Sequence, residues 1–131
     1  MDMAKAIDGV QLKFRVSGKY ISLLKDGKLT RNDVVMLIKE AQKRNMVVDL
    51  SGKDLHNLNL SELSFGRANL SNVNLSNSNL SKATFFDANV SNADLTNSNL
   101  SYTDFSYANL VHTKTAGSNM ANAVMLKTVV F

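Results

Sequence analysis

The amino-acid sequence predicts a mainly β protein in which short strands wind into a coil behind an N-terminal α/β segment. Three observations lead to this fold class. From residue 50 onward an apolar residue recurs at every fifth position. The residues on either side of it follow the same period of five. Before residue 46 that period is absent, and ordinary strand and helix patterns take its place.

The first 45 residues are expected to form a basic cap made of a β-hairpin and a helix. Apolar and polar residues alternate over 10–16, which is typical of a half-buried strand, and a second short strand is expected over 20–24. A helix is expected over 30–45, with Thr30 as its N-cap and one apolar face. Repeat stacks need covered ends, so we expect residues 1–45 to close the N-terminal end of the repeats.

Residues 46–131 form the second predicted unit, the repeat coil. The central residue is apolar in fifteen of sixteen units, and Thr115 is the exception. The residue before the centre is Asn or Asp in twelve units, and the residue two before it is small in thirteen. A period of five fits neither a helix nor an unbroken strand, but it fits a short strand followed by a tight corner. The small residue and the centre then point inward, and the Asn or Asp points outward.

Units twenty residues apart share a corner if four units complete one turn of the coil. One interior column then contains Phe65, Phe85, Phe105 and Met125. We expect its aromatic rings to stack as a packing device. The unit around Thr115 departs from the repeat pattern, which predicts a bulge or loosened pairing there.

Several blocks resemble a known consensus. Residues 68–72 (Ala-Asn-Leu-Ser-Asn) and 93–97 (Ala-Asp-Leu-Thr-Asn) are similar to the Ala-Asp/Asn-Leu-x-x unit of the pentapeptide-repeat family, and the resemblance covers residues 46–127. It implies the family's fold, a right-handed quadrilateral β-helix, with about four coils at this length. It also implies a binding or scaffold role, which some members fulfil as bacterial effectors delivered into hosts.

The sequence lacks the residue combinations typical of enzymes. There is no cysteine, which excludes thiolate metal ligands and a cysteine nucleophile. His56 and His112 fall at different corners about three coils apart, so they cannot share a metal ion, and each is expected on the solvated surface. No nucleotide-binding glycine pattern is present. We therefore expect a non-enzymatic protein with no metal site and no cofactor.

Three aromatic residues, Phe86, Tyr102 and Tyr107, occupy corner positions where Ser, Asn or Gly is usual. Phe86 and Tyr107 are expected at one corner in adjacent coils, with Tyr102 at the preceding corner. Grouped aromatic residues on a polar surface are typical of the core of a protein interface. The alternative is that they are isolated exposed side chains without a role.

The C-terminal run ends without a polar cap. Its apolar residues are predicted to form a homodimer interface, because two such ends meeting on a two-fold axis would cover each other. The residues are Met125, Leu126, Val129, Val130 and Phe131. The alternative is a monomer in which these residues fold back over the last coil.

The formal charge of +4 lies in the first third of the chain. Residues 1–45 contain ten Lys and Arg against five Asp and Glu, and residues 46–131 contain five against six. The basic segment keeps nucleic-acid binding open as an alternative, although no binding motif accompanies it. A second alternative follows from the resemblance: some pentapeptide-repeat proteins mimic DNA and modulate bacterial type II topoisomerases. Those rely on a strongly acidic coil, which this chain lacks.

No apolar run reaches the length of a membrane span, and the N-terminus lacks the apolar core of a signal peptide. The expected location is the bacterial cytoplasm, with secretion as an effector as the alternative. The expected partner is a protein that the sequence does not identify.

Overall fold

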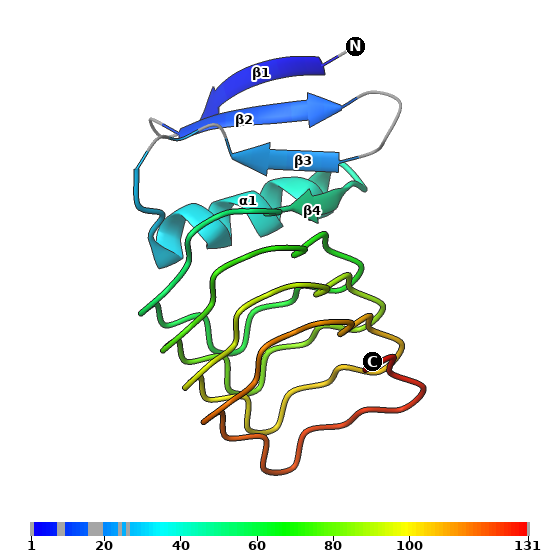
Figure 1. The fold of residues 1–131 in the computed structure, drawn as a ribbon. Helices are drawn as coiled ribbons and strands as arrows, with labels where there is room; N and C mark the ends of the chain where they lie inside the picture. The colour runs from blue at the N-terminus through cyan, green and yellow to red at the C-terminus, as the bar shows by residue number, and fades with distance from the viewer. Residues whose placement is uncertain (1, 8–9, 16–19, 24, 26, 131) are drawn as a thin grey trace.

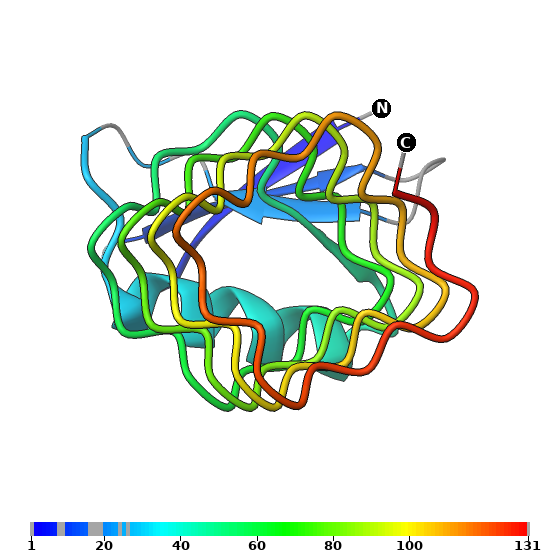
Figure 2. The same cartoon turned by 60° about the horizontal axis from the view of Figure 1, so that its bottom comes forward.

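The structure is a computed structural model that describes residues 2–7, 10–15, 20–23, 25 and 27–130. A small sheet and one helix lie at one end of a stack of coils (Figure 1). Seen obliquely from the other end of the stack, successive coils have similar outlines, and the helix and sheet lie behind the first of them (Figure 2).

The sheet has the strand order β1-β2-β3-β4. Strands β1 (Asp2–Ile7), β2 (Val10–Arg15) and β3 (Tyr20–Leu23) pair in antiparallel fashion. The last strand, β4 (Val47–Asp49), pairs in parallel with β3. Because Asp49 also bridges to the coil below it, β4 joins the sheet directly to the stack.

Helix α1 (Arg31–Lys43) begins and ends with well-formed caps. The Asp33 N–H donates to Thr30 Oγ1 (3.2 Å), and the Thr30 N–H donates to Asp33 Oδ2 (2.9 Å), which is a capping box. At its C-terminus Asn45 adopts φ 52°, and the Met46 N–H donates to the Ala41 carbonyl (2.8 Å). This Schellman-type ending turns the chain from the helix into β4.

The expected strands over 10–16 and 20–24 and the expected helix over 30–45 correspond to β2, β3 and α1, each slightly shorter than predicted. Strands β1 and β4 were not predicted. The turn of the expected β-hairpin, between its strands at 17–19, lies outside the described residues.

From β4 onward the chain forms a β-helix of pentapeptide repeats. Parallel bridges join residues twenty apart, from Asp49 with Asn69 to Asn109 with Val129. One turn of the backbone therefore takes four pentapeptides. Each pentapeptide adds one short bridge on one face, as the five-residue period predicted.

The corners explain the sequence preferences around each centre. The second residue after each centre adopts a left-handed conformation, as Asn72 does at φ 60°. The Val73 N–H donates to the Leu70 carbonyl (3.3 Å), which closes a turn of type II character. The Asn69 side chain accepts hydrogen bonds from the N–H (3.1 Å) and hydroxyl (2.8 Å) of Ser71. An Asn followed two residues later by Ser thus holds the corner.

The interior follows the predicted aromatic column as far as Phe105, but Met125, its expected fourth member, is 38% exposed in the last coil. The ring centroids of Phe65 and Phe85 are 5.4 Å apart, and those of Phe85 and Phe105 are 4.7 Å apart, with nearly parallel planes. All three rings are at most 1% exposed. The aromatic column is confirmed as a packing element of the core.

The prediction of a bulge or loosened pairing at Thr115 is wrong. The Leu95 N–H donates to the Lys114 carbonyl (2.8 Å), and Gly117 adopts φ 72°, close to the φ of 57° at Asn97 one coil above. The polar centre is tolerated without a bulge because this unit belongs to the last coil, where the Thr115 side chain is exposed rather than buried.

Two cations attach the N-terminal segment to the first coil. Arg31 Nη1 donates to the carbonyls of Asn59 (2.9 Å) and Ser61 (3.2 Å). Lys28 Nζ donates to the carbonyl of His56. These carbonyls face the side on which every lower coil has a neighbour, so the cations replace the donors of a missing coil.

His56 lies at the surface, as expected, but its ring also makes contacts within the chain. Its Nδ1 lies 2.5 Å from Asp54 Oδ1 and 2.9 Å from Lys28 Nζ, so the ring takes part in the contact between the first coil and the N-terminal segment. The hydrogen bond with His56 lowers the pKa of Asp54 below its ordinary value. His112 is exposed, as expected.

Candidate protein-interaction surface

Four stacked units share the corner that contains the phenylalanine column. We call it the phenylalanine corner and define it as residues 64–67, 84–87, 104–107 and 124–127. On its outer side Phe86 and Tyr107 are 46% and 45% exposed. Their ring centroids lie 5.4 Å apart in an edge-to-face arrangement, with planes at 63°. The sequence placed these two residues at one corner, and the structure brings their rings into contact.

In the 84–87 unit the phenylalanine corner is held by weaker hydrogen bonds than most other corners. The Phe86 N–H reaches Thr84 Oγ1 at only 3.4 Å, and Phe86 has no hydroxyl to add a second bond. In the next unit the N–H and hydroxyl of Ser91 donate to Asn89 Oδ1 at 3.1 and 2.7 Å. Phe86 therefore contributes less hydrogen bonding to the stability of the coil than the serine that is usual at this position.

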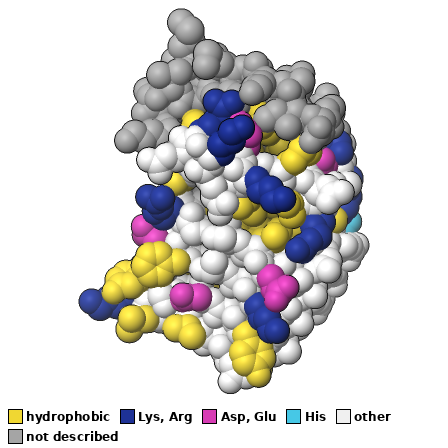
Figure 3. Space-filling model, turned by 180° about the vertical axis from the view of Figure 1, so that it is seen from behind, with side chains coloured by type: hydrophobic (Ala, Val, Ile, Leu, Met, Phe, Trp, Pro, Cys, Tyr) yellow, Lys and Arg dark blue, Asp and Glu magenta, His cyan; other side chains and the backbone are white. Residues whose placement is uncertain are grey.

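Tyr107 is also an unusual choice for the backbone. It has φ 63°, a left-handed conformation that favours Gly and Asn over bulky residues. Lys127 Nζ lies 5.9 Å from the centre of its ring, so a cation borders the aromatic pair. Hydrophobic and basic side chains lie close together near one lower edge of the face shown in Figure 3.

Tyr102 lies apart from this pair. It is 61% exposed at the neighbouring corner, again with positive φ (58°). Within the described part of the chain its ring contacts no other aromatic ring. The structure thus joins two of the three predicted aromatic residues and leaves the third separate.

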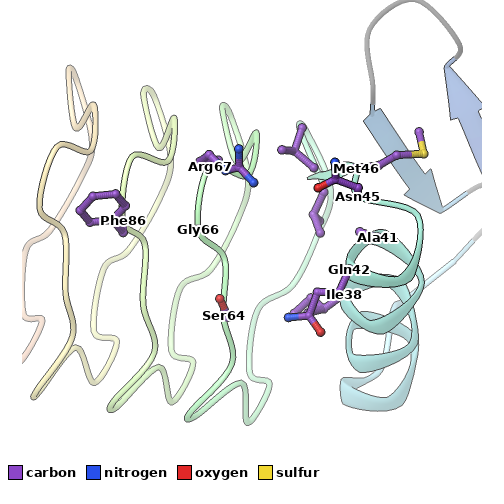
Figure 4. Close-up of a pocket in the computed structure, with 11 residues that line it drawn as sticks. Ile38, Ala41, Gln42, Asn45, Met46, Ser64, Gly66, Arg67 and Phe86 are labelled. Atoms are coloured by element: carbon purple, nitrogen blue, oxygen red, sulfur yellow. The ribbon is translucent and has the colours of Figure 1, made fainter.

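A groove that the sequence analysis missed lies beside the phenylalanine corner. It has a volume of about 390 Å³ and runs between α1 and the first coil. Its wall includes Ile38 and Met46 on one side and Gly66, Arg67 and Phe86 on the other (Figure 4). The signal in the sequence is Gly66, which stands where most units have Ser or Thr and contributes no side chain.

The predicted oligomer interface lies at the C-terminal end of the stack, which no described residue covers. Its apolar side chains are well exposed: Met125 38%, Val129 43%, Leu126 58% and Val130 58%. A hollow of about 160 Å³ opens beside them, lined by Leu110, Thr113, Thr115, Met120, Met125 and Val130. Phe131 lies outside the described residues.

The carboxyl groups with lowered pKa values take part in local structure. Burial raises the pKa of Asp33, but hydrogen bonds from Lys25 and Thr30 outweigh it and leave the pKa below its ordinary value. The N–H and hydroxyl of Thr96 lower the pKa of Asp94, a corner carboxylate. Among the described residues no group of three or more His, Cys, Asp or Glu could hold a metal ion.

Three residues of the basic segment are engaged within the chain. Lys25 Nζ lies 2.8 Å from Asp33 Oδ2, and Lys28 and Arg31 bind carbonyls of the first coil. Lys19 lies outside the described residues. These contacts give the basic residues a structural role that the sequence analysis did not foresee.

Comparison with known families matches the one described as "Pentapeptide repeats", with eight copies, to residues 48–77, 64–101 and 78–114. These segments together cover just over half of the chain. No curated protein matches. In the part of the chain that the structure describes, no helix is long and apolar enough to cross a membrane.

Solved structures similar to the chain include pentapeptide-repeat proteins from plants and cyanobacteria. AT2G44920 from the Arabidopsis thaliana thylakoid lumen is 34% identical, with a TM-score of 0.46 over 61% of this chain and 59% of that one. Rfr23 from Cyanothece 51142 is 28% identical, with a TM-score of 0.38 over 60% and 57%. HetL from Nostoc sp. strain PCC 7120, involved in heterocyst differentiation regulation, is 24% identical, with a TM-score of 0.32 over 63% and 42%. The chain spans less than two thirds of each.

Proposed function

Because the chain belongs to the pentapeptide-repeat family, we propose that it is a non-enzymatic binding module that contacts a protein partner through its phenylalanine corner. In this proposal residues 46–131 form a right-handed quadrilateral β-helix of about four coils, and residues 1–45 form its N-terminal cap. The module acts in the bacterial cytoplasm or as a secreted effector.

One observation carries the proposal: the exposed edge-to-face pair of Phe86 and Tyr107. Neither residue is the one that best stabilises its corner, since Phe86 keeps only one long hydrogen bond to Thr84 and Tyr107 occupies a left-handed position. Exposed aromatic pairs bordered by a cation, here Lys127, supply the large contact area that dominates many protein interfaces. Tyr102 is assigned to the edge of the same surface.

A matched pair of double variants tests this surface. Phe86→Ser with Tyr107→Asn restores the usual repeat residues at the phenylalanine corner. Val111→Ser with His112→Asn makes the same kind of change at another corner and serves as the control. Both variants should fold. In affinity capture with quantitative mass spectrometry, proteins retained by the wild type and the control should be lost with Phe86→Ser/Tyr107→Asn. Equal retention by all three proteins would contradict the proposal.

A second surface supports self-association. The last coil exposes Met125, Leu126, Val129 and Val130 beside an apolar hollow, and an apolar end of this kind is covered when two copies meet on a two-fold axis. We therefore assign the C-terminal end, with Phe131 included from the sequence, to a homodimer interface.

Sedimentation of the wild type and a Leu126→Asp/Val130→Asp variant tests the homodimer. The wild type should sediment as a dimer at tens of micromolar and the variant as a monomer. A monomeric wild type, or a variant that stays dimeric, would contradict the assignment.

The charge distribution argues against the two alternatives. The coil carries five basic and six acidic residues over 46–131, far from the dense negative charge of a DNA mimic. Two cations of the basic segment, Lys28 and Arg31, bind carbonyls of the first coil and are therefore less available to phosphate groups.

A further inference from the structure

The backbone of each lower coil uses a fixed set of groups to pair with the coil above it. In the second coil, Thr84 accepts from the Phe65 N–H at 2.7 Å and donates to the Leu63 carbonyl at 3.0 Å. The Phe86 carbonyl accepts from the Arg67 N–H at 2.8 Å. One N–H and two carbonyls thus face upward at the phenylalanine corner.

The same groups of the first coil have nothing above them to pair with. They are the N–H and carbonyl of Ser64 and the carbonyl of Gly66, and they make no backbone hydrogen bond with any described residue. On the other faces of this coil, β3 pairs with β4, Lys28 binds the His56 carbonyl and Arg31 binds two further carbonyls. The phenylalanine corner is left as a short open edge of a parallel sheet.

The groove lies over this open edge. Its lining combines Ser64, Gly66 and Arg67 with apolar residues from α1, from β4 and the residue before it, and from the second coil: Ile38, Ala41, Met46, Val48 and Phe86. Figure 4 shows the side chains of Phe86 and Ile38 on opposite sides of the space beside Gly66. A volume of about 390 Å³ falls in the lower part of the range of ligand pockets, about 300–1,000 Å³, which suits a short segment of chain.

One charge lines the groove. Arg67 is exposed and forms no ion pair with a described residue. A guanidinium binds carboxylates through two parallel hydrogen bonds, which favours an acidic group on whatever occupies the groove.

We propose that this groove binds an extended, acidic peptide segment of the protein partner by β-strand addition. The segment runs parallel to residues 63–67, its N–H groups donate to the Ser64 and Gly66 carbonyls, and one of its carbonyls accepts from the Ser64 N–H. An apolar side chain contacts Phe86 and Ile38, and a carboxylate binds Arg67. The inference rests on the proposed function, because Phe86 belongs to both surfaces, and it adds the chemistry of the ligand.

Fluorescence anisotropy with labelled heptapeptides tests the proposal on the full chain. The probes have a central Leu between β-branched residues and carry Asp or Glu at each flanking position in turn. Matched probes replace the acid with Lys, or methylate the backbone nitrogens on either side of the Leu. At least one acidic probe should bind with a dissociation constant of about 100 μM or tighter. Charge reversal and N-methylation should each weaken binding about tenfold or more.

Variants of the protein test whether the peptides bind in the groove. Gly66→Leu fills it, and a large residue is compatible with this repeat position because Phe86 and Leu126 occupy it in other coils. A Cβ at Gly66 would meet its nearest atom, the Phe86 carbonyl oxygen, at an ordinary 3.7 Å. Gly66→Leu should abolish binding, and Arg67→Glu should weaken the acidic probes while favouring the Lys probes.

Tyr107→Asn separates this proposal from the proposed function, since Tyr107 does not line the groove. It should leave peptide binding unchanged while reducing capture of the partner. Peptide binding that is insensitive to Gly66→Leu and Arg67→Glu would overturn the groove proposal, as would the absence of any acidic probe that binds better than its Lys counterpart. Neither result would affect the assignment of Phe86 and Tyr107.

Discussion

The two ends of the stack differ in what covers them. At the first coil, α1 and β3 lie over the core, and Lys28 and Arg31 donate to outward-facing carbonyls. At the last coil the centres Met120 and Met125 are partly or well exposed, and the backbone from Thr115 onward has no described segment below it. One end has polar donors and a helix, and the other has apolar side chains.

This difference indicates that one end of a β-helix can serve the stability of the fold while the other end serves binding. An end covered by hydrogen bonds from the same chain is closed to others, because its backbone groups are satisfied. An uncovered apolar end remains available, and hydrophobic contact suits it better than specific hydrogen bonding. The groove at Ser64 and Gly66 is the local exception at the covered end.

The largest difference between the ends is expected for truncation within the phenylalanine column. Phe65 is 1% exposed beneath the N-terminal cap, whereas Met125 is 38% exposed at the open end. Phe65→Ala should lower the free energy of unfolding by about 3–5 kcal/mol, as for other buried phenylalanines. Met125→Ala should lower it by only about 1–2 kcal/mol, since more than a third of the Met125 surface is already exposed. Urea denaturation of the monomeric protein measures both, and equal losses would contradict the comparison.

Removal of a cationic donor should have a smaller effect. Arg31→Met keeps much of the length of the side chain but leaves the carbonyls of Asn59 and Ser61 without donors. The expected loss of stability is about 1–3 kcal/mol. Lys127→Met, at the open end, is the matched control and should change stability by less than about 0.5 kcal/mol. If both substitutions cost the same, Arg31 has no special role in covering the first coil.

Acid should weaken the covered end through Asp33. The folded pKa of this carboxyl is lowered, so its contribution is fully present above the ordinary carboxyl pKa and is lost as the pH falls through the lowered value. The stability gap between wild type and Asp33→Asn should therefore be constant near neutral pH and shrink below about pH 4. Thermal unfolding from pH 7 to pH 2 tests this expectation. A gap that grows on acidification would have the wrong sign.

The smallest effect is expected at the corners. Tyr107→Asn should raise the free energy of unfolding by up to about 0.5 kcal/mol, because Asn tolerates the left-handed conformation better than a bulky residue. Asn72→Tyr makes the reverse change at another corner and should lower it by a similar amount. Chemical denaturation of the two variants measures both, and a loss of stability in Tyr107→Asn would assign Tyr107 a structural role.

The sequence predicts those parts of the fold that depend on residues close together in the chain or twenty apart. The five-residue period leads to the coil, the phenylalanine column and the shared corner of Phe86 and Tyr107. Strand β4 has only three residues, and its role depends on pairing with β3, which no local pattern records. The contact of Lys28 with His56 joins residues 28 positions apart in segments of different periodicity.

The groove is harder to predict for a related reason. Gly66 marks it in the sequence, but an absent side chain creates a groove only if another element lies opposite. That element is α1, whose placement follows from the Schellman-type ending at Asn45 and from the packing of its buried face. Both are tertiary relations between residues of the N-terminal segment and the first coil.

Amide hydrogen exchange at two protein concentrations tests the contrast between the ends most directly. The N–H groups of Leu55 and Leu60 donate to Asn74 and Asn79 (2.7 and 2.8 Å), so they should exchange slowly at any concentration. The N–H groups at 115, 120 and 125 face the open end and should exchange rapidly in dilute protein. At concentrations where the dimer forms, protection should rise at 115, 120 and 125 and stay unchanged at Leu55 and Leu60. Protection at 115, 120 and 125 that is already high in dilute protein and independent of concentration would contradict the account.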